Sequence, residues 1–225
     1  GHHTAQFNLG IMYEQGLGVI QSDELAFKYT KLCAEQGHAN AQFNAGVHYL
    51  EGKGVEQSDT EAFKYYKLAA DQGQHEAQFN VGLMYDQGRG VIQSDTLAFT
   101  YYKLAAEAGH LDAQYNVGNR YAFGKGVEHS LTNAREWWTN AAKQGDKAAV
   151  GQLKFLDEHE HSWTKAREWM TNVAKQGGKV AVGQLKFLDE HEGRTTHSNF
   201  TDNSTVLCSK CNKPAQTNRT LRKCK

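Results

Sequence analysis

Ala5-Gln6-Phe7-Asn8-Leu9-Gly10 is the first of four closely similar stretches that lie 36 residues apart in this chain of 225 residues. The other three are Ala41-Gln42-Phe43-Asn44-Ala45-Gly46, Ala77-Gln78-Phe79-Asn80-Val81-Gly82 and Ala113-Gln114-Tyr115-Asn116-Val117-Gly118. A period of this length is typical of stacked supersecondary units, each of which buries its apolar face only against its neighbours. The chain therefore predicts a repeat architecture rather than one compact globular core.

Each unit contains two helical patterns, here termed helix A and helix B, with a glycine turn between them. In the unit 41–73, small and aromatic residues recur at helical spacing in both halves, at Ala41, Ala45, Gly46 and Tyr49 and then at Ala62, Phe63, Tyr66, Ala69 and Ala70. Gly52 and Gly54 end helix A, because glycine adopts left-handed backbone angles without strain. Ser58 fits the N-cap of helix B, with Glu61 three residues later as in a capping box. The unit thus predicts an all-α fold built from helix pairs.

A glycine also stands inside helix A of every unit. Mid-helix glycine costs about 0.5–1 kcal/mol relative to alanine, so its recurrence predicts a close crossing of helices A and B at that point. These glycines are Gly10, Gly46, Gly82 and Gly118. The position two residues later holds Met12, His48, Met84 and Arg120. Such variety predicts a surface position with no common task.

Taken together, these elements resemble the Sel1-like repeat, a relative of the tetratricopeptide repeat with a slightly longer unit. The resemblance rests on Ala-x-Phe/Tyr-x-Leu-Gly-x-x-Tyr in helix A, Gly-x-Gly-Val in the turn, and Ala-Phe-x-Tyr-Tyr-x-x-Ala-Ala-x-x-Gly in helix B. It implies a right-handed α-solenoid of antiparallel helix pairs, with helix A lining the inner surface. It also implies a non-catalytic adaptor or scaffold whose partners are other proteins or peptides.

The regular array is expected to change after about residue 145. Residues 131–160 and 163–192 differ at only six of 30 aligned positions, which indicates a recent duplication. This block has lost four residues and with them the Gly-x-Gly turn. We therefore expect repeats over 1–192, with 36-residue units to about 145 and then two shortened 32-residue units. Residues 193–206 are polar and predict a linker, and 207–225 form a separate cysteine-containing segment.

The inner surface should come from helix A positions that do not face helix B. By helical spacing, the partner-binding candidates are Ile11, Glu14, Gln15, Val47, Leu50, Glu51, Leu83, Asp86, Gln87, Asn119, Ala122 and Phe123. Aliphatic residues with acidic neighbours would suit an extended or helical peptide of basic character. A further column, at Phe7, Phe43, Phe79 and Tyr115, either adds to this surface or packs one repeat on the next.

The C-terminal segment predicts an incomplete zinc site. Cys208 and Cys211 have the Cys-x2-Cys spacing of half a tetrahedral thiolate site, and Cys224 follows 13 residues after Cys211. The arrangement resembles the start of a MYND-type zinc finger, which implies zinc as cofactor and a fourth ligand from water, His197 or a cysteine beyond Lys225. Small modules of this kind depend on metal for folding, so a poorly ordered tail is expected. Incidental cysteines or a disulfide are the alternatives.

The overall charge and the absence of known catalytic patterns restrict the function class. The chain has 25 Lys and Arg against 25 Asp and Glu, and this balance gives no general attraction to nucleic acid. No apolar run approaches the roughly 18 residues that indicate a membrane span. No catalytic triad spacing and no phosphate loop after a strand is recognisable. We expect no enzyme activity, and neither nucleic acid nor membrane as a partner.

The compartment is less directly encoded. Three Asn-x-Ser/Thr sequons in the tail overlap the zinc-type cysteine pattern, and no signal peptide is visible, so we expect a cytoplasmic or nuclear location. A secretory lumen is the alternative, with the chain acting as a quality-control subunit. The chain starts at a repeat boundary, which also leaves open that it is the repeat portion of a larger ubiquitin-ligase or methyltransferase-type polypeptide.

Overall fold

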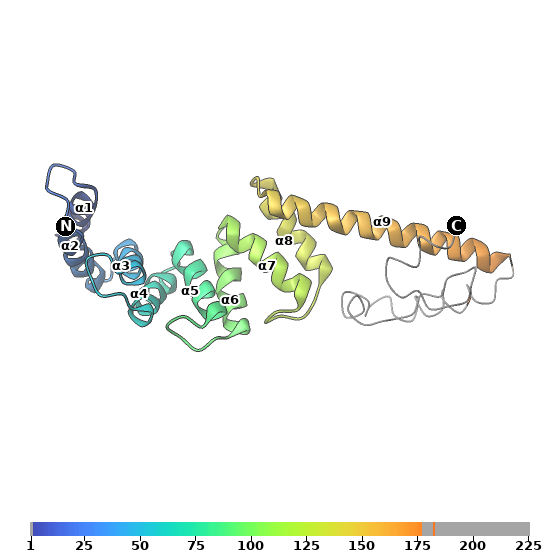
Figure 1. Ribbon diagram of the computed structural model, residues 1–225, viewed down its shortest axis with the longest axis horizontal. Coiled ribbons are helices and arrows are strands. Elements are labelled where there is room, and N and C mark those ends of the chain that lie inside the picture. The colour runs from blue at the N-terminus through green and yellow to red at the C-terminus, as the bar shows by residue number, and fades with distance from the viewer. Residues whose placement is uncertain (1, 177–181, 183–225) are drawn as a thin grey trace, which may run out of the picture. The chain divides into compact units, whose positions relative to one another are not determined.

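A computed structural model describes residues 2–176 and 182, and every regular element in that part of the chain is an α-helix (Figure 1). The helices are α1 (His2–Gln15), α2 (Asp23–Glu35), α3 (Ala39–Glu51), α4 (Asp59–Asp71), α5 (His75–Gln87), α6 (Asp95–Glu107), α7 (Leu111–Phe123), α8 (Leu131–Lys143) and α9 (Lys147–Lys175). The chain divides into two units, Gly1–Phe155 and Leu156–Lys225. The predicted all-α fold is confirmed.

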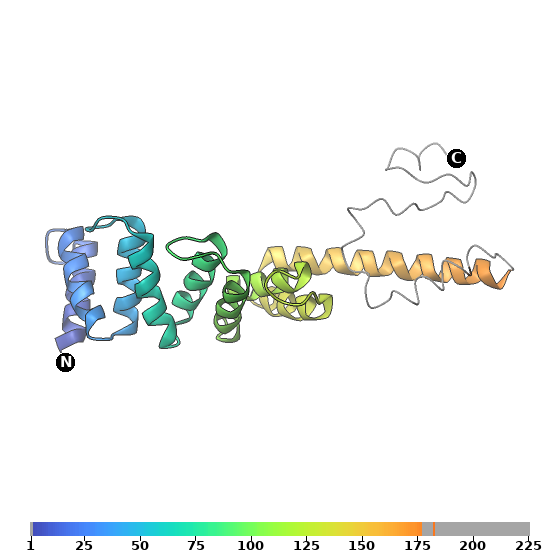
Figure 2. The same ribbon diagram turned by 90° about the horizontal axis from the view of Figure 1, so that it is seen from below.

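Helices α1 to α8 form four successive hairpins, α1–α2, α3–α4, α5–α6 and α7–α8, which are repeats 1 to 4 (Figures 1 and 2). Helix A of repeat 2 ends at Gly52, which has a left-handed φ of 70°. Helix B begins after Ser58, whose Oγ accepts a hydrogen bond from the backbone N–H of Glu61 at 3.3 Å. The equivalent N-caps are Ser22, Ser94 and Ser130. The glycine turn and the serine cap thus set the hairpin as the sequence predicts.

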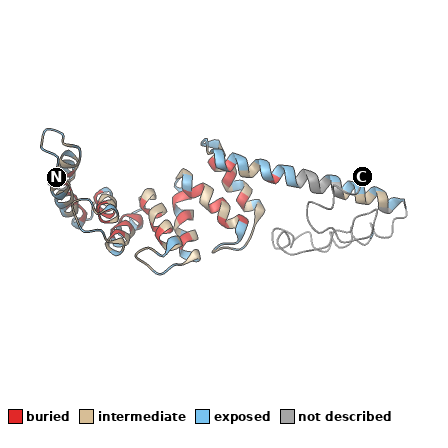
Figure 3. Ribbon diagram, in the orientation of Figure 1, coloured by how far each residue is buried: buried red, intermediate tan, exposed pale blue. Residues whose placement is uncertain are grey.

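Buried residues lie where helices A and B face each other (Figure 3). They are mainly alanines and aromatic residues. Ala45 and Ala62 are fully buried, and Tyr49 stacks on Tyr65 with ring centroids 5.6 Å apart. A Cβ added at Gly46 would lie 2.6 Å from the ring of Tyr66. Gly82 and Gly118 meet Tyr102 and Trp138 in the same way. The predicted close crossing of the two helices is confirmed.

Successive repeats approach each other through the second glycine of the turn. A Cβ at Gly54 would overlap the backbone carbonyl of Asp23, at the start of α2 in the preceding repeat. Gly90 and Gly126 meet Asp59 and Asp95 in the same way. These glycines also have positive φ angles, so both the backbone conformation and the close approach require glycine. The turn of one repeat therefore packs on helix B of the previous one.

Beyond repeat 4 the chain forms one helix, α9, of 29 residues. Seven residues, 124–130, separate helices A and B in repeat 4, whereas three residues, 160–162, stand at the corresponding place in α9. Ser162 stands at the position of the cap Ser130, but the Gly-x-Gly pair is missing, so no glycine ends the helix and α9 runs through this serine. The described part of the chain thus contains no hairpin after residue 147. The array boundary at 192 stays a prediction, and the linker 193–206 and the segment 207–225 lie outside the described residues.

Candidate interaction surface

The predicted partner-binding residues occupy three columns along α1, α3, α5 and α7. The column of Gln15, Glu51, Gln87 and Phe123 is exposed, and Phe123 has 72% of its surface accessible. The column of Ile11, Val47, Leu83 and Asn119 is half-buried, as are Glu14, Leu50 and Asp86. Ala122 differs, because only 3% of its surface is accessible. Its inclusion in the partner-binding surface is therefore wrong.

A second correction concerns the position two residues after the mid-helix glycine. His48 and Met84 are each 3% exposed and Arg120 is 4% exposed, whereas Met12 in the first repeat is 37% exposed. The assignment of this column to the surface is therefore wrong for repeats 2 to 4. In these repeats the side chains face the preceding repeat, a contact that the spacing within one helix does not reveal.

The aromatic column of helix A packs repeats together. Phe79 stacks on His110 of the next repeat with ring centroids 4.5 Å apart, and Phe7 lies 5.2 Å from His38. Phe79 also contacts Tyr102 of its own repeat at 5.6 Å. Of the two roles open for this column, the packing role therefore accounts for its contacts.

Across each junction, the residue in the Glu14 column lies near the residue in the His48 column of the next repeat. Asp86 pairs with Arg120, and their Oδ1 and Nη2 atoms are 2.6 Å apart. Leu50 packs against the same apolar cluster that contains Met84. Glu14 and His48 line one small pocket. The chemistry of the two columns therefore changes together from junction to junction.

The junction between repeats 3 and 4 contains a closed cluster of charges. Besides its contact with Asp86, Arg120 Nη1 donates to the backbone carbonyls of Asp95 and Lys125, both at 3.3 Å. Lys125 Nζ lies 2.8 Å from Asp86 Oδ1 and 3.3 Å from Asp95 Oδ1. Burial opposes ionisation of Asp86, but hydrogen bonds from Lys125 and Arg120 outweigh it and lower the pKa of this carboxyl group. The Arg120 guanidinium also lies over the Tyr102 ring, 5.2 Å from its centroid.

A glutamine relay connects helices at the other end of repeats 1, 2 and 4. Gln42 Nε2 donates to the carbonyl of Ala34 in the preceding repeat at 3.2 Å, and its Oε1 accepts from Gln72 of its own repeat at 2.6 Å. The equivalent pair in repeat 4 is Gln114 and Gln144, at 2.8 Å. Sequence analysis did not identify this relay, although a glutamine at the Gln42 position in all four copies was a signal for it.

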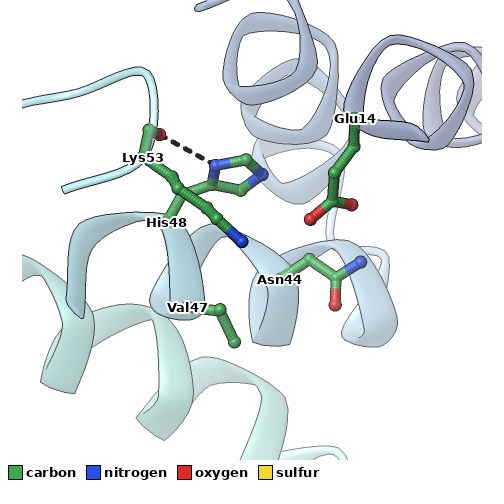
Figure 4. A pocket seen from close by; sticks show the side chains of 5 residues that line it. All are labelled: Glu14, Asn44, Val47, His48 and Lys53. Atoms are coloured by element: carbon green, nitrogen blue, oxygen red, sulfur yellow. Dashed lines mark hydrogen bonds between the residues drawn. The ribbon is translucent and has the colours of Figure 1, made fainter. Parts of the chain in front are cut away.

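Repeats 1 and 2 enclose a pocket on the helix A side. Its lining residues are Glu14, Asn44, Val47, His48 and Lys53, and Figure 4 shows the Glu14 carboxylate extending toward the space bordered by Asn44 and the His48 ring. His48 Nδ1 lies 2.9 Å from the backbone carbonyl of Lys53. The cavity volume of about 60 Å³ is far below the roughly 300–1,000 Å³ of a cofactor site. It is suited to the end of one side chain.

Comparison with known protein families agrees with this geometry. The family model described as Sel1 repeat matches residues 3–38, 39–74, 75–110 and 111–146, and each match spans one hairpin. The chain belongs to the Sel1 repeat family. Sel1 repeat proteins generally act as protein-interaction scaffolds and are generally non-catalytic.

Solved structures support the same fold. A Sel1 repeat protein from Oxalobacter formigenes is 34% identical, with a TM-score of 0.65, and the match covers 67% of this chain and 62% of that one. The protective antigen c5321 of uropathogenic Escherichia coli, which has an SLR fold, is 32% identical, with a TM-score of 0.69 and coverages of 85% and 42%. The chain thus spans less than two thirds of either relative. A comparison with curated proteins found no match.

The Sel1 hairpins contain no evident metal centre in the part of the chain that the structure describes, since no three His, Cys, Asp or Glu side chains there are placed to hold one ion. Cys33, which is described, is buried. The predicted ligands Cys208, Cys211 and Cys224 lie outside the described residues. Within residues 2–176 and 182, no helix has both the length and the apolarity to cross a membrane.

Proposed function

We propose that the chain is a non-catalytic scaffold that binds basic peptide segments of partner proteins on the exposed face of α1, α3, α5 and α7. The main support is the charge of these four helices, which carry five carboxylates and one permanent cation. The carboxylates are Glu14, Glu51, Glu76, Asp86 and Asp112, and the cation is Arg120. Arg120 is buried and paired with Asp86, so the exposed charge that these four helices themselves carry is acidic. The turn lysines Lys53 and Lys125 pair with Glu51 and Asp86 and leave Glu14, Glu76 and Asp112 as further acidic groups. An acidic face attracts a basic partner.

Substitutions on the two faces of the array test this proposal. The triple variant Glu51→Lys, Gln87→Lys and Phe123→Lys places three lysines in the exposed helix A column and makes its charge positive. The control Leu32→Lys, Leu68→Lys and Leu104→Lys adds the same number of lysines, at the same spacing, to exposed positions of helix B. We expect cross-linking with mass spectrometry to place partner peptides on helix A of the wild type and the control, and the helix A variant to lose them. Equal capture by both triple variants, with unchanged helical circular dichroism, would exclude the helix A face.

We propose a zinc-binding recruitment module in the C-terminal segment as a second element. It is supported by the Cys-x2-Cys spacing of Cys208 and Cys211 and by Cys224, with His197 or a residue beyond Lys225 as the fourth ligand. Metal analysis of the purified full chain should give one zinc per chain, and Cys208→Ser should remove it. Zinc content that is equal in the two proteins would contradict the assignment.

A cytoplasmic or nuclear location completes the proposal. The sequons at Asn199, Asn203 and Asn218 then carry no glycan. Treatment of the protein expressed in a eukaryotic cell with a glycosidase should leave its electrophoretic mobility unchanged. A shift would instead favour the lumenal quality-control role.

A further inference from the structure

Two junctions of the array carry an acidic residue and a lysine at the same repeat positions. Residues of the junction between repeats 1 and 2 correspond to residues 72 positions later, between repeats 3 and 4. Glu14 thus corresponds to Asp86, and Lys53 to Lys125. His48, however, stands where the later junction has Arg120. The earlier junction thus keeps a carboxylate, that of Glu14, but has the shorter His48 side chain in place of arginine.

The later junction holds the guanidinium group of Arg120. The Arg120 guanidinium contacts the Asp86 carboxylate at 2.6 Å and also donates to the carbonyl of Lys125 at 3.3 Å. Tyr102 lies against the guanidinium, 5.2 Å from the ring centroid to Cζ. Three kinds of contact therefore hold this cation, namely a carboxylate, a backbone carbonyl and a ring face.

At the earlier junction, the corresponding groups do not fill the space between them. His48 Nδ1 reaches the carbonyl of Lys53, which is the counterpart of the Lys125 carbonyl, but no ion pair joins His48 to Glu14 among the described contacts. Thr30 replaces Tyr102 and is smaller. The pocket of about 60 Å³ lies here, with the Glu14 carboxylate and the Asn44 amide on its wall (Figure 4). Three of its lining residues, Glu14, His48 and Lys53, are the counterparts of Asp86, Arg120 and Lys125.

Lys53 lines this pocket, but its ammonium group forms an ion pair with Glu51 of the exposed helix A column. Lys53 Nζ pairs with Glu51 Oε2 at 3.2 Å. In repeat 4 the residue equivalent to Glu51 is Phe123, which offers no charge, and Lys125 pairs with Asp86 instead. Lys53 thus makes its ion pair with Glu51, although the Glu14 charge still acts on it.

We propose that the Glu14 pocket, lined by Glu14, Asn44, Val47, His48 and Lys53, binds the guanidinium group of an arginine side chain from a partner protein. The partner's arginine would take the role that Arg120 has within the chain, with Glu14 and the Asn44 Oδ1 as acceptors. As a site for a partner's side chain, this inference rests on the proposed function, although the affinity of the pocket for a guanidinium ion does not. It makes arginine the anchor of the bound basic segment.

Methylguanidinium is the direct probe of the pocket. In a nuclear magnetic resonance titration of the full chain at constant ionic strength, the backbone amides of Glu14, Asn44 and His48 should shift with saturation. Glu14→Gln should weaken binding by about tenfold or more, because it removes the charge-assisted hydrogen bond. His48→Arg should abolish binding by filling the pocket from within. Shifts that do not saturate, or saturation that survives in both variants, would overturn the proposal.

Two further variants separate a local effect from a general change in charge. Glu51→Phe, which reproduces repeat 4, should release Lys53 to pair with Glu14 and so weaken methylguanidinium binding by about tenfold. The control Glu56→Gln removes one exposed carboxylate nearby and should leave the affinity unchanged. Equal losses in both variants would mean that only the net charge matters, and would overturn the pocket assignment.

The source of the guanidinium is tested by comparing an acetyl-Gly-Gly-Arg-Gly-Gly amide peptide with agmatine and with the citrulline form of the peptide. The arginine peptide should bind at least about tenfold more tightly than the citrulline form, and more tightly than agmatine. If agmatine binds as well as the peptide, the site serves a small guanidinium compound and the partner assignment is wrong. Partners that cross-link to helix A equally in Glu14→Gln would refute the anchor while leaving the scaffold proposal intact.

Discussion

Gln78 and Ala108 lie at the one place in repeats 1 to 4 where the glutamine relay is interrupted. Gln78 Nε2 donates to the carbonyl of Ala70 at 3.3 Å, but its buried Oε1 has no hydrogen-bond partner in the described part of the chain. Repeats 1, 2 and 4 have Gln36, Gln72 and Gln144 at the position of Ala108. A buried acceptor without a partner costs stability.

Ala108→Gln should therefore stabilise the array, by about 1 kcal/mol, because the new amide can donate to Gln78 Oε1 as Gln72 does to Gln42. Urea unfolding followed by circular dichroism measures the gain. In the background Gln78→Ala, the same substitution should give no gain. If it stabilises both backgrounds equally, helix propensity rather than the relay is responsible.

Arg120→Met should destabilise the array by about 2–3 kcal/mol, because it leaves Asp86 partly buried next to only one remaining cation. Arg89→Met is the matched control, since Arg89 pairs with Asp59 across the preceding junction but its side chain is 40% exposed. That exposed pair should contribute less than about 1 kcal/mol. Hydrogen exchange should show the loss of protection in α5, α6 and α7. Equal effects of the two substitutions would mean that burial does not distinguish the two arginines.

The helix pairs and their caps follow from local sequence, because glycine and serine act on backbone angles within one or two turns. The contact between repeats does not, and Arg120 shows why. Arg120 belongs to the column of Met12, His48 and Met84, which would be exposed on an isolated hairpin. Its side chain becomes buried only because a second hairpin stacks against it. The signal for that stacking was a correlation over 34 residues, in which Glu14 faces His48, Leu50 faces Met84 and Asp86 faces Arg120.

Gly46→Ala should destabilise the protein by about 1–3 kcal/mol, because its new Cβ would lie 2.6 Å from the Tyr66 ring. This loss opposes the gain in helix propensity of about 1 kcal/mol. Gly151→Ala in α9 is the matched control, since no atom beyond the neighbouring backbone of its own helix lies within 4 Å of the added Cβ. It should stabilise the helix by roughly 0.5–1 kcal/mol. Thermal unfolding compares the two, and stabilisation by Gly46→Ala would contradict the close crossing.

The last prediction concerns pH and the start of α7. The His110 Nδ1 accepts a hydrogen bond from the backbone N–H of Ala113 at 3.3 Å, so the ring must be neutral there. Burial lowers the pKa of His110, Asp112 and Glu76 oppose this effect, and His75 adds to it. Because the folded-state pKa lies below the unfolded value of about 6.5, the stabilisation is complete above that pH. It is lost as the pH falls through the folded-state pKa.

His110→Gln isolates this effect, because Gln74 already caps α5 through its side chain at the equivalent position. The variant should keep the cap and lose the part of the pH dependence that arises below about pH 6.5. As the pH is lowered from 8 to 5, the unfolding free energy of the wild type should therefore fall relative to that of the variant. Curves that match at neutral pH should diverge in favour of the variant, and a wild type that is more stable at neutral pH should lose that advantage. Parallel curves over the whole range would show that protonation of His110 does not weaken the junction between repeats 3 and 4.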